Sequence, residues 1–254
     1  MGAILKRRRN NGNPLVIAHR GYSTVYPENT LIAFEKAIEA GCDIIELDVQ
    51  MTVDERVVVF HDFTLERTTN GSGEVRSTTL EEMKKLDAGL WRGEEFSGVR
   101  VPTLEEAIAC VGQRVGLFIE IKAKRGKEYR ERNERLCDKL SESLLKNDDR
   151  SNHTLVSFDM NCLERMCALM PEMGRGLIAF GVNDVAKLAG RVEGLALFWK
   201  NVTSPLVKRA HAEGLWICAW TVDEADRMRK FVGMGVDAIA SNDAATLRRV
   251  IDEC

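Results

Sequence analysis

The sequence predicts a (β/α)8 barrel of the TIM-barrel type, an α/β fold, with a small insertion between the second strand and its helix. Eight short apolar runs rich in β-branched residues recur along the chain, and segments with helical spacing separate most of them. Near-continuous apolar strands are what a parallel sheet needs when both of its faces are buried. A chain of 254 residues also has the size of such a barrel. A doubly wound sheet is the structural alternative, but no GxGxxG motif follows the first strand.

The eight predicted strands are short and apolar, and we expect them to alternate with helices in βα units. They are LVIAH at 15–19, DIIELDV at 43–49, LFIEIK at 117–122, TLVSF at 154–158, GLIAF at 176–180, LALFW at 195–199, LWICAW at 215–220 and DAIAS at 237–241.

The predicted helices have recognisable starts and ends. The first begins after Tyr26, with Pro27 in its first turn, and ends before Gly41. Thr103 and Asp159 are expected to cap the N-termini of later helices. Glycines that favour C-terminal stops are Gly112, Gly214 and Gly235. The remaining main helices are predicted at 103–111, 128–146, 159–170, 204–213, 223–234 and 243–253.

A second strand-like run interrupts the alternation after the second strand. Residues 57–61 follow DIIELDV too closely for a crossover helix, so we expect an antiparallel hairpin that turns near Asp54 and Glu55. The midpoint between positions 48 and 61 falls on that turn. This register would place His61 across from Asp48.

The residues after the hairpin are rich in Thr, Gly, Ser, Glu and Arg, with one short helix near 80–86. We therefore expect residues 49–101 to form an insertion that ends before the helix starting at Thr103. Because eight βα units account for the remaining length, the insertion is expected to belong to one barrel domain that includes residues 1–254.

The charge and apolar content of the chain argue against several classes of protein. With 36 basic and 39 acidic side chains the formal charge is −3, and the only dense basic run is 6–9, so we expect no nucleic-acid partner. No apolar run approaches the roughly 18 residues of a membrane-spanning helix, so we expect no stable membrane insertion. The basic N-terminus lacks the apolar core of a signal peptide, and seven scattered cysteines without a CxxC pair are typical of free thiols. We expect a soluble, cytoplasmic protein, for which a homodimer is one possible assembly.

Three carboxylates are expected to meet at the mouth of the barrel, where the C-terminal ends of the strands and the loops beyond them hold the reactive residues. Glu46 and Asp48 lie two residues apart near the end of the second strand, so they point to the same face, and Glu120 lies on the third strand. Confined carboxylates repel one another unless a cation sits among them, and an all-oxygen set suits one Mg²⁺ or Ca²⁺ ion. The alternative is a salt-bridge network with Arg20 and Lys122, which is less favoured for three carboxylates than for one.

Two of the four histidines are expected at the same mouth. His19 ends the first strand, and the hairpin brings His61 close to the carboxylates. Both side chains can give and take a proton near neutral pH. His153, in a loop, and His211, in a helix, are expected to be exposed bystanders.

Two histidines, a divalent metal ion, Arg20 and Lys122 form a set suited to attack on a phosphate ester. The cations neutralise charge on the non-bridging oxygens in the transition state. One histidine activates the nucleophile and the other protonates the leaving alkoxide. A phosphodiester with an alcohol leaving group needs that protonation most, because an unprotonated alkoxide leaves poorly.

The ordered motifs of the chain resemble those of the glycerophosphodiester phosphodiesterase family over nearly its full length. HRG, PENT, the E-x-D pair and HD occur in order within residues 18–62. LERTTNGSGEV, VPTLEEAI, IEIK, VSFD and AWTV follow in order. So many ordered motifs are far more specific than any one of them.

The resemblance implies hydrolysis of small-molecule glycerophosphodiesters to sn-glycerol 3-phosphate and an alcohol. It implies a metal ion on Glu46, Asp48 and Glu120, and His19 and His61 as the acid–base pair. It adds phosphate contacts from Arg20 and Lys122, and it suggests that Phe158 and Trp220 line the substrate site, although both aromatics could instead belong to the barrel core.

Two positions depart from the family pattern. The hairpin turn has Asp54-Glu55 where Asp-Gly is typical, and glutamate tolerates a positive φ poorly. The last strand ends in SNDA, where an ending like T-D-x-P is common, at the barrel rim beside the site.

Two alternative functions stay open. A lysophospholipase D would need an apolar groove for an acyl chain, which Phe63, Leu90, Trp91 and Phe96 of the insertion could supply. A non-catalytic barrel that binds a phosphodiester is disfavoured because every member of the metal and histidine set is present. The residues also leave open whether water or the substrate's own glycerol hydroxyl attacks the phosphorus.

Overall fold

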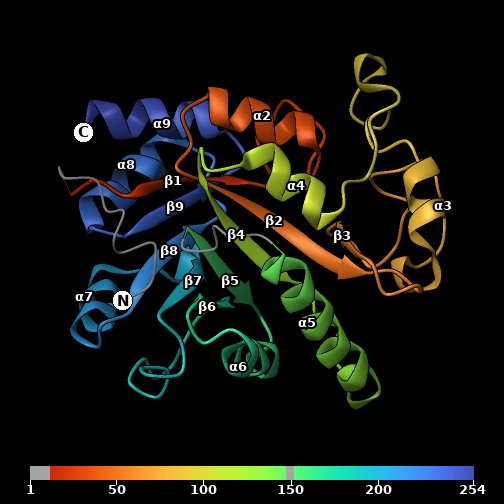
Figure 1. The fold of residues 1–254 in the computed structure, drawn as a ribbon. Helices are drawn as coiled ribbons and strands as arrows, with labels where there is room; N and C mark the ends of the chain where they lie inside the picture. Colours follow the sequence, from red (N-terminus) through yellow and green to blue (C-terminus); the bar gives the residue numbers. More distant parts are fainter. Residues whose placement is uncertain (1–11, 147–151) are drawn as a thin grey trace.

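Eight parallel strands close into a barrel in the computed structural model, which describes residues 12–146 and 152–254 (Figure 1). The first strand pairs with both the second and the last, so no edge of the parallel sheet stays open. The predicted TIM barrel is therefore confirmed. Its strands are β1 (Leu15–His19), β2 (Ile44–Met51), β4 (Gly116–Ile121), β5 (His153–Ser157), β6 (Gly174–Ala179), β7 (Gly194–Phe198), β8 (Trp216–Trp220) and β9 (Ala238–Ser241).

Helices cover the outside of the barrel (Figure 1). They are α2 (Leu31–Glu39), α4 (Leu104–Val111), α5 (Arg130–Leu145), α6 (Met160–Leu169), α7 (Ser204–Ala212), α8 (Ala225–Met234) and α9 (Ala244–Glu253). Within the described residues the connection from β6 to β7, residues 180–193, contains no helix, so one of the eight expected βα units lacks its helical half. None of the described helices has the length and apolarity needed to cross a membrane.

The predicted helix caps are present, but the first helix starts later than expected. Thr103 accepts a hydrogen bond from the backbone N–H of Glu106 in a capping box, and Asp159 caps α6. The first helix begins at Leu31 rather than just after Tyr26, because Asn29 has a φ of 57° and Thr30 is extended. Residues before Leu31 are therefore free to form a loop at the barrel mouth.

The interior core of the barrel contains one large ring among smaller apolar side chains. Trp216 is fully buried, and its ring centroid lies 5.5 Å from that of Phe118 across the barrel. Neighbouring strands make room for it with glycines: a Cβ at Gly194 would lie 1.9 Å from Trp216 Cδ2, and one at Gly176 would lie 2.3 Å from Cη2. These close approaches require glycine at both positions.

The hairpin after β2 exists, but its register differs by one residue from the prediction. Strand β3 (Val57–Val59) pairs antiparallel with β2, and the backbone N–H of Phe60 donates to Asp48 O at 2.9 Å. Phe60, rather than His61, therefore lies opposite Asp48. His61 follows directly after the ladder.

The turn of the hairpin explains this shift. Thr52 and Arg56 close it, because the backbone N–H of Thr52 donates to Arg56 O at 3.0 Å. Three residues, 53–55, thus form the loop, and its last residue, Glu55, has the positive φ (59°) that such loops need. The expected conflict between glutamate and a positive φ is present in the structure.

The insertion packs around a small core of its own and lies beyond the ends of β2 and β3, at the right of Figure 1. It contains the helix α3 (Leu80–Lys85), with short 3-10 turns at Val75–Ser77 and Glu94–Phe96. Two further 3-10 turns lie outside the insertion, at Lys127–Tyr129 and Trp199–Asn201. Its buried apolar side chains are Val58, Phe60, Leu65, Val75, Met83, Ala88 and Val101.

The expectation that two histidines are exposed bystanders is wrong for His153. His153 begins β5 instead of lying in a loop, and its side chain is buried in the barrel wall. His211 lies on α7 as predicted, but its Nε2 lies 2.7 Å from Asp237 Oδ2, a carboxylate that also accepts from the backbone N–H of Ile217. Neither histidine lines the cavity at the barrel mouth.

Candidate active site

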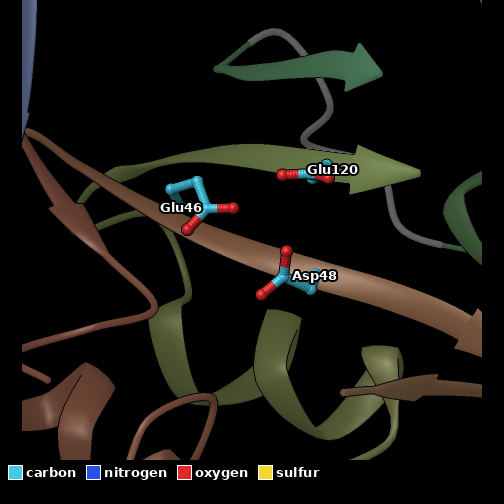
Figure 2. Close-up of side chains that lie close together, drawn as sticks. All are labelled: Glu46, Asp48 and Glu120. Atoms are coloured by element: carbon cyan, nitrogen blue, oxygen red, sulfur yellow. The ribbon is translucent and has the colours of Figure 1, made fainter. Parts of the chain in front are cut away.

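Three carboxylates meet where β2 and β4 run side by side (Figure 2). Glu46 and Asp48 come from β2, and Glu120 is paired with Asp48 in the parallel register of β4. One oxygen of each residue lies within 4.8 Å of the others, and all three side chains are buried. The two-residue spacing along β2 explains why both of its carboxylates face the same point.

Two cations lie against this cluster. Lys122 Nζ is 2.9 Å from Asp48 Oδ1 and 2.6 Å from Glu120 Oε1, while Arg20 Nε is 3.3 Å from Asp48 Oδ2. The salt bridges considered as an alternative therefore exist. They leave Glu46 Oε1 buried without a hydrogen-bond partner among the described residues.

The pKa is raised for two of the carboxylates, Glu46 and Glu120, and lowered for Asp48. Burial raises the pKa of Glu46 well above its usual range, and the neighbouring Asp48 and Glu120 raise it further. Burial also raises the pKa of Glu120, to about 7, against the opposing effect of Lys122. Burial would raise the pKa of Asp48 too, but Lys122 and Arg20 outweigh it and lower that pKa. Without a further cation, the cluster therefore retains protons near neutral pH.

These residues fit a divalent metal ion. The donor set consists of carboxylate oxygens alone, which is what hard cations such as Mg²⁺ and Ca²⁺ prefer. The unpartnered oxygen of Glu46 and the raised pKa of Glu46 and Glu120 are the features that a bound cation would relieve. The chain thus has a buried acidic group able to bind a metal ion.

A residue that sequence reasoning missed holds Asp48 in place. Asn29 Nδ2 donates to Asp48 Oδ2 at 2.7 Å, and the backbone N–H of Asp48 donates to Asn29 Oδ1 at 3.3 Å. Asn29 is buried, at a positive φ that asparagine tolerates better than most residues. It belongs to the PENT motif, which was a sign of the family but not of this contact.

His19 is held at the end of β1 by another missed residue. Its Nδ1 donates to Asn242 Oδ1 at 2.7 Å, so the Nε2 lone pair is free, and Nε2 lies 3.9 Å from Glu46 Oε2. Asn242 is oriented in turn by Asp223, whose Oδ2 accepts from Asn242 Nδ2 at 2.8 Å. Burial, followed by the nearby Arg20, lowers the pKa of His19 to about 4. The unusual SNDA ending of the last strand thus supplies the partner of His19.

His61 is held by an ion network that runs back to Arg20. Its Nδ1 lies 2.5 Å from Asp62 Oδ1, and Arg67 Nε donates to Asp62 Oδ2 at 2.6 Å. Arg67 also makes two hydrogen bonds to Glu28, which accepts a further one from Arg20 at 2.9 Å. Hydrogen bonding from Arg67 lowers the pKa of Asp62 to about 2, and burial lowers the pKa of His61. Asp62, Arg67 and Glu28 were not among the predicted site residues, although they lie in the HD, LERTTNG and PENT motifs.

A cavity of about 270 Å³ unites the predicted residues. His19, Arg20, Glu46, His61, Glu120 and Lys122 line it, together with Phe158 and Trp220. Asp48 lies behind this lining, fully buried and in contact with Lys122. The two aromatics also pack against the interior core of the barrel, so they line the cavity and belong to the core at the same time.

The four apolar residues considered for an acyl groove do not share this cavity. Phe63 lies beside Lys124, and Phe96 packs edge-on against Tyr26 at 5.7 Å between ring centroids. Leu90 and Trp91 are partly exposed on the insertion. None of the four lines the cavity that contains the carboxylates.

Comparisons with known proteins agree with this geometry. The model of a family described as the glycerophosphoryl diester phosphodiesterase family matches residues 19–246. A glycerophosphodiester phosphodiesterase of Caldanaerobacter subterraneus is 38% identical over 240 residues, which cover 93% of this chain and 97% of that protein. One of Bacillus altitudinis is 34% identical over 229 residues, covering 88% of this chain and 92% of that protein.

A solved structure is also similar. It is an Oleispira antarctica phosphodiesterase in complex with the product sn-glycerol-3-phosphate. It superimposes on this chain with a TM-score of 0.88 at 33% identity, covering 95% of this chain and 98% of the other.

Proposed function

The chain belongs to the glycerophosphoryl diester phosphodiesterase family and is a phosphoric diester hydrolase; from that premise we propose that it releases sn-glycerol 3-phosphate and an alcohol from small glycerophosphodiesters. The observation that carries the proposal is the single cavity in which His19, His61 and Lys122 face a buried carboxylate cluster. The product bound in the Oleispira relative supports the same reaction.

We propose that Glu46, Asp48 and Glu120 hold one divalent ion, Mg²⁺ or Ca²⁺. When bound, the ion supplies Lewis-acid polarisation of the phosphate and offsets the negative charge of the cluster. Asn29 keeps Asp48 oriented toward the centre of the cluster through its 2.7 Å hydrogen bond. Lys122, which touches both Asp48 and Glu120, would turn one of its N–H donors toward a phosphate oxygen.

Arg20 is the second phosphate contact in this proposal. Its side chain lines the cavity and is fixed from behind by Glu28, so its guanidinium is pre-oriented. Together, Arg20 and Lys122 neutralise the non-bridging oxygens as charge builds up in the transition state.

His19 and His61 form the acid–base pair. Each has its Nδ1 engaged, by Asn242 and Asp62 respectively, so Nε2 is the nitrogen left for proton transfer. One takes a proton from the nucleophile, either water or the substrate's glycerol hydroxyl, and the other gives a proton to the leaving alkoxide. The lowered pKa of both histidines favours the neutral form that the general base requires. The histidine that acts as general acid must take up a proton on Nε2 before it can protonate the leaving alkoxide.

The test is release of glycerol 3-phosphate from glycerophosphocholine by purified protein. His61→Ala and His19→Ala are each expected to lower kcat by about 10²-fold to 10⁴-fold, the usual contribution of a general acid or base. His211→Gln, which removes a histidine outside the cavity, is the matched control and should keep its turnover. Near wild-type turnover in either alanine variant would remove that histidine from the mechanism.

We further propose that residues 1–254, with the insertion at 49–101, act as one barrel domain in the cytoplasm, as a monomer or a homodimer. The seven cysteines are free thiols, as expected in a reducing compartment. Limited proteolysis tests the first statement: cleavage that released a folded insertion would contradict it. Light scattering on the purified protein decides between the two assembly states.

A further inference from the structure

One half of the catalytic cavity carries no charged side chain. The charged lining comes from β1, β2, β4 and His61, whereas the ends of β5, β6 and β8 supply Phe158, Phe180 and Trp220. Below these rings the lining continues with aliphatic side chains such as Val156 and Ile178. A phosphodiester bound at the charged half would have this apolar half beside one of its two ester arms.

The three rings form one continuous surface, which we call the aromatic wall (Phe158, Phe180 and Trp220). Their centroids are 5.8, 5.7 and 5.8 Å apart, so every ring contacts the other two. Phe180 is 61% exposed, the highest value among the large apolar side chains of the described residues. An aromatic ring left open at the mouth of a catalytic cavity indicates a contact surface for a ligand.

Neighbouring rings show what this cluster attracts. Phe198, which touches Phe180 and Trp220, has Lys200 Nζ 5.9 Å from its centroid, and Arg227 stacks 3.6 Å over Trp199. Among the described residues, no lysine or arginine lies over the three rings of the aromatic wall. No lysine or arginine of the described residues therefore competes for these rings, and the exposed Phe180 is accessible to a cation brought by the substrate.

We propose that the aromatic wall binds the alcohol arm of the diester and prefers a quaternary ammonium alcohol of the choline type. This proposal rests on the proposed function. A trimethylammonium group has no N–H to satisfy, is weakly hydrated and is attracted to the faces of aromatic rings. An ethanolamine ammonium or a polyol would instead lose hydrogen bonds to water that Phe158, Phe180 and the aliphatic lining cannot replace.

The test measures kcat/KM of the wild-type enzyme for three substrates: glycerophosphocholine, glycerophosphoethanolamine and the 3,3-dimethylbutyl ester of glycerol 3-phosphate. The third compound is an uncharged isostere of the choline ester. The attraction between a cation and exposed rings should make kcat/KM for the choline ester about tenfold higher than for the isostere. Equal rates for choline ester and isostere would show that only apolar contact matters and would overturn the proposal, as would preference for the ethanolamine ester. Hydrolysis of none of the three would instead refute the proposed function itself.

Variants of Phe180 distinguish cation–π attraction from apolar contact. Phe180→Leu keeps an apolar side chain but removes the ring, so the choline-to-isostere ratio should fall toward one, whereas Phe180→Trp should retain it. Phe96→Leu, which removes a ring of the insertion outside the cavity, is the matched control and should keep the wild-type ratio. An unchanged ratio in Phe180→Leu would overturn the assignment.

Discussion

Metal binding should depend strongly on pH near neutrality, because Glu120 must lose its proton before it can bind the ion. Burial raises the pKa of Glu120 to about 7 in the metal-free protein. About one molecule in eleven then has this carboxyl ionised at pH 6 and about ten in eleven at pH 8, so the apparent association constant should rise about tenfold, or about 1.4 kcal/mol. The raised pKa of Glu46 steepens the dependence.

The free energy of unfolding of the metal-free protein should fall as pH rises, whereas metal affinity rises. The ordinary pKa of a glutamate, 4.5, lies below the folded value of about 7 for Glu120. Between these two values the folded state holds a proton that the unfolded chain has lost, so stability falls as pH rises through this window. A bound metal ion should therefore stabilise the protein more at pH 8 than at pH 6.

Isothermal titration calorimetry with Mg²⁺ and Ca²⁺ measures the association constant and the number of protons released on binding. In two buffers of different ionisation enthalpy, binding should release about 0.9 proton from Glu120 at pH 6 and about 0.1 at pH 8. Glu120→Gln should bind the ion more weakly and release fewer protons, while Glu81→Gln, an 82% exposed carboxylate of the insertion, is the control. Affinity and proton release that stay constant from pH 6 to pH 8 would refute the reasoning.

Two further predictions concern the positioning of His61 and the barrel interior. Asp62→Asn removes the carboxylate that holds Nδ1 of His61 and should lower kcat about 10²-fold, and Arg67→Met should lower kcat about tenfold. Stopped assays of kcat and KM check both variants. An unchanged kcat would show that the network does not position the histidine. Gly194→Ala places a Cβ within 1.9 Å of Trp216 and should lower the free energy of unfolding by about 3 kcal/mol, which corresponds to a drop of about 6–12 °C in Tm. A Tm within about 2 °C of wild type would show that the interior can rearrange to accept the methyl group.

The barrel was predictable because its strands are buried on both faces. Runs such as LVIAH and LFIEIK need no long-range information to be recognised, and the period of two along a strand was enough to bring Glu46 and Asp48 to one face. The cluster with Glu120 followed from the rule that parallel strands end at the same side of the barrel.

The hairpin register and the start of the first helix depend on backbone conformation that composition does not determine. A loop of three residues rather than two moved Phe60 opposite Asp48, and a difference of one residue is enough to change every facing pair. The helix start depended on Asn29, whose positive φ is stabilised by its contact with Asp48, 19 positions away.

The residues that hold the histidines could not be assigned from spacing. Asn242 lies 223 positions from His19, and the two meet only because the last strand closes the barrel beside the first. Arg67 reaches Glu28 from the insertion, whose path over the barrel mouth has no periodic signal in the sequence. Motif matching placed Glu28 and Arg67 in the family pattern, and Asn242 at a departure from it, without showing what any of them contacts.

Turnover after metal removal tests most directly whether Glu46, Asp48 and Glu120 hold an ion that hydrolysis requires. Wild-type enzyme is dialysed against a chelator and then against chelex-treated buffer, and glycerol 3-phosphate release from glycerophosphocholine is measured before and after Mg²⁺ or Ca²⁺ is added back. We predict that release stops after dialysis and returns with the added ion, and that Asp48→Asn does not recover. Undiminished release from the metal-free enzyme would contradict the proposed metal site.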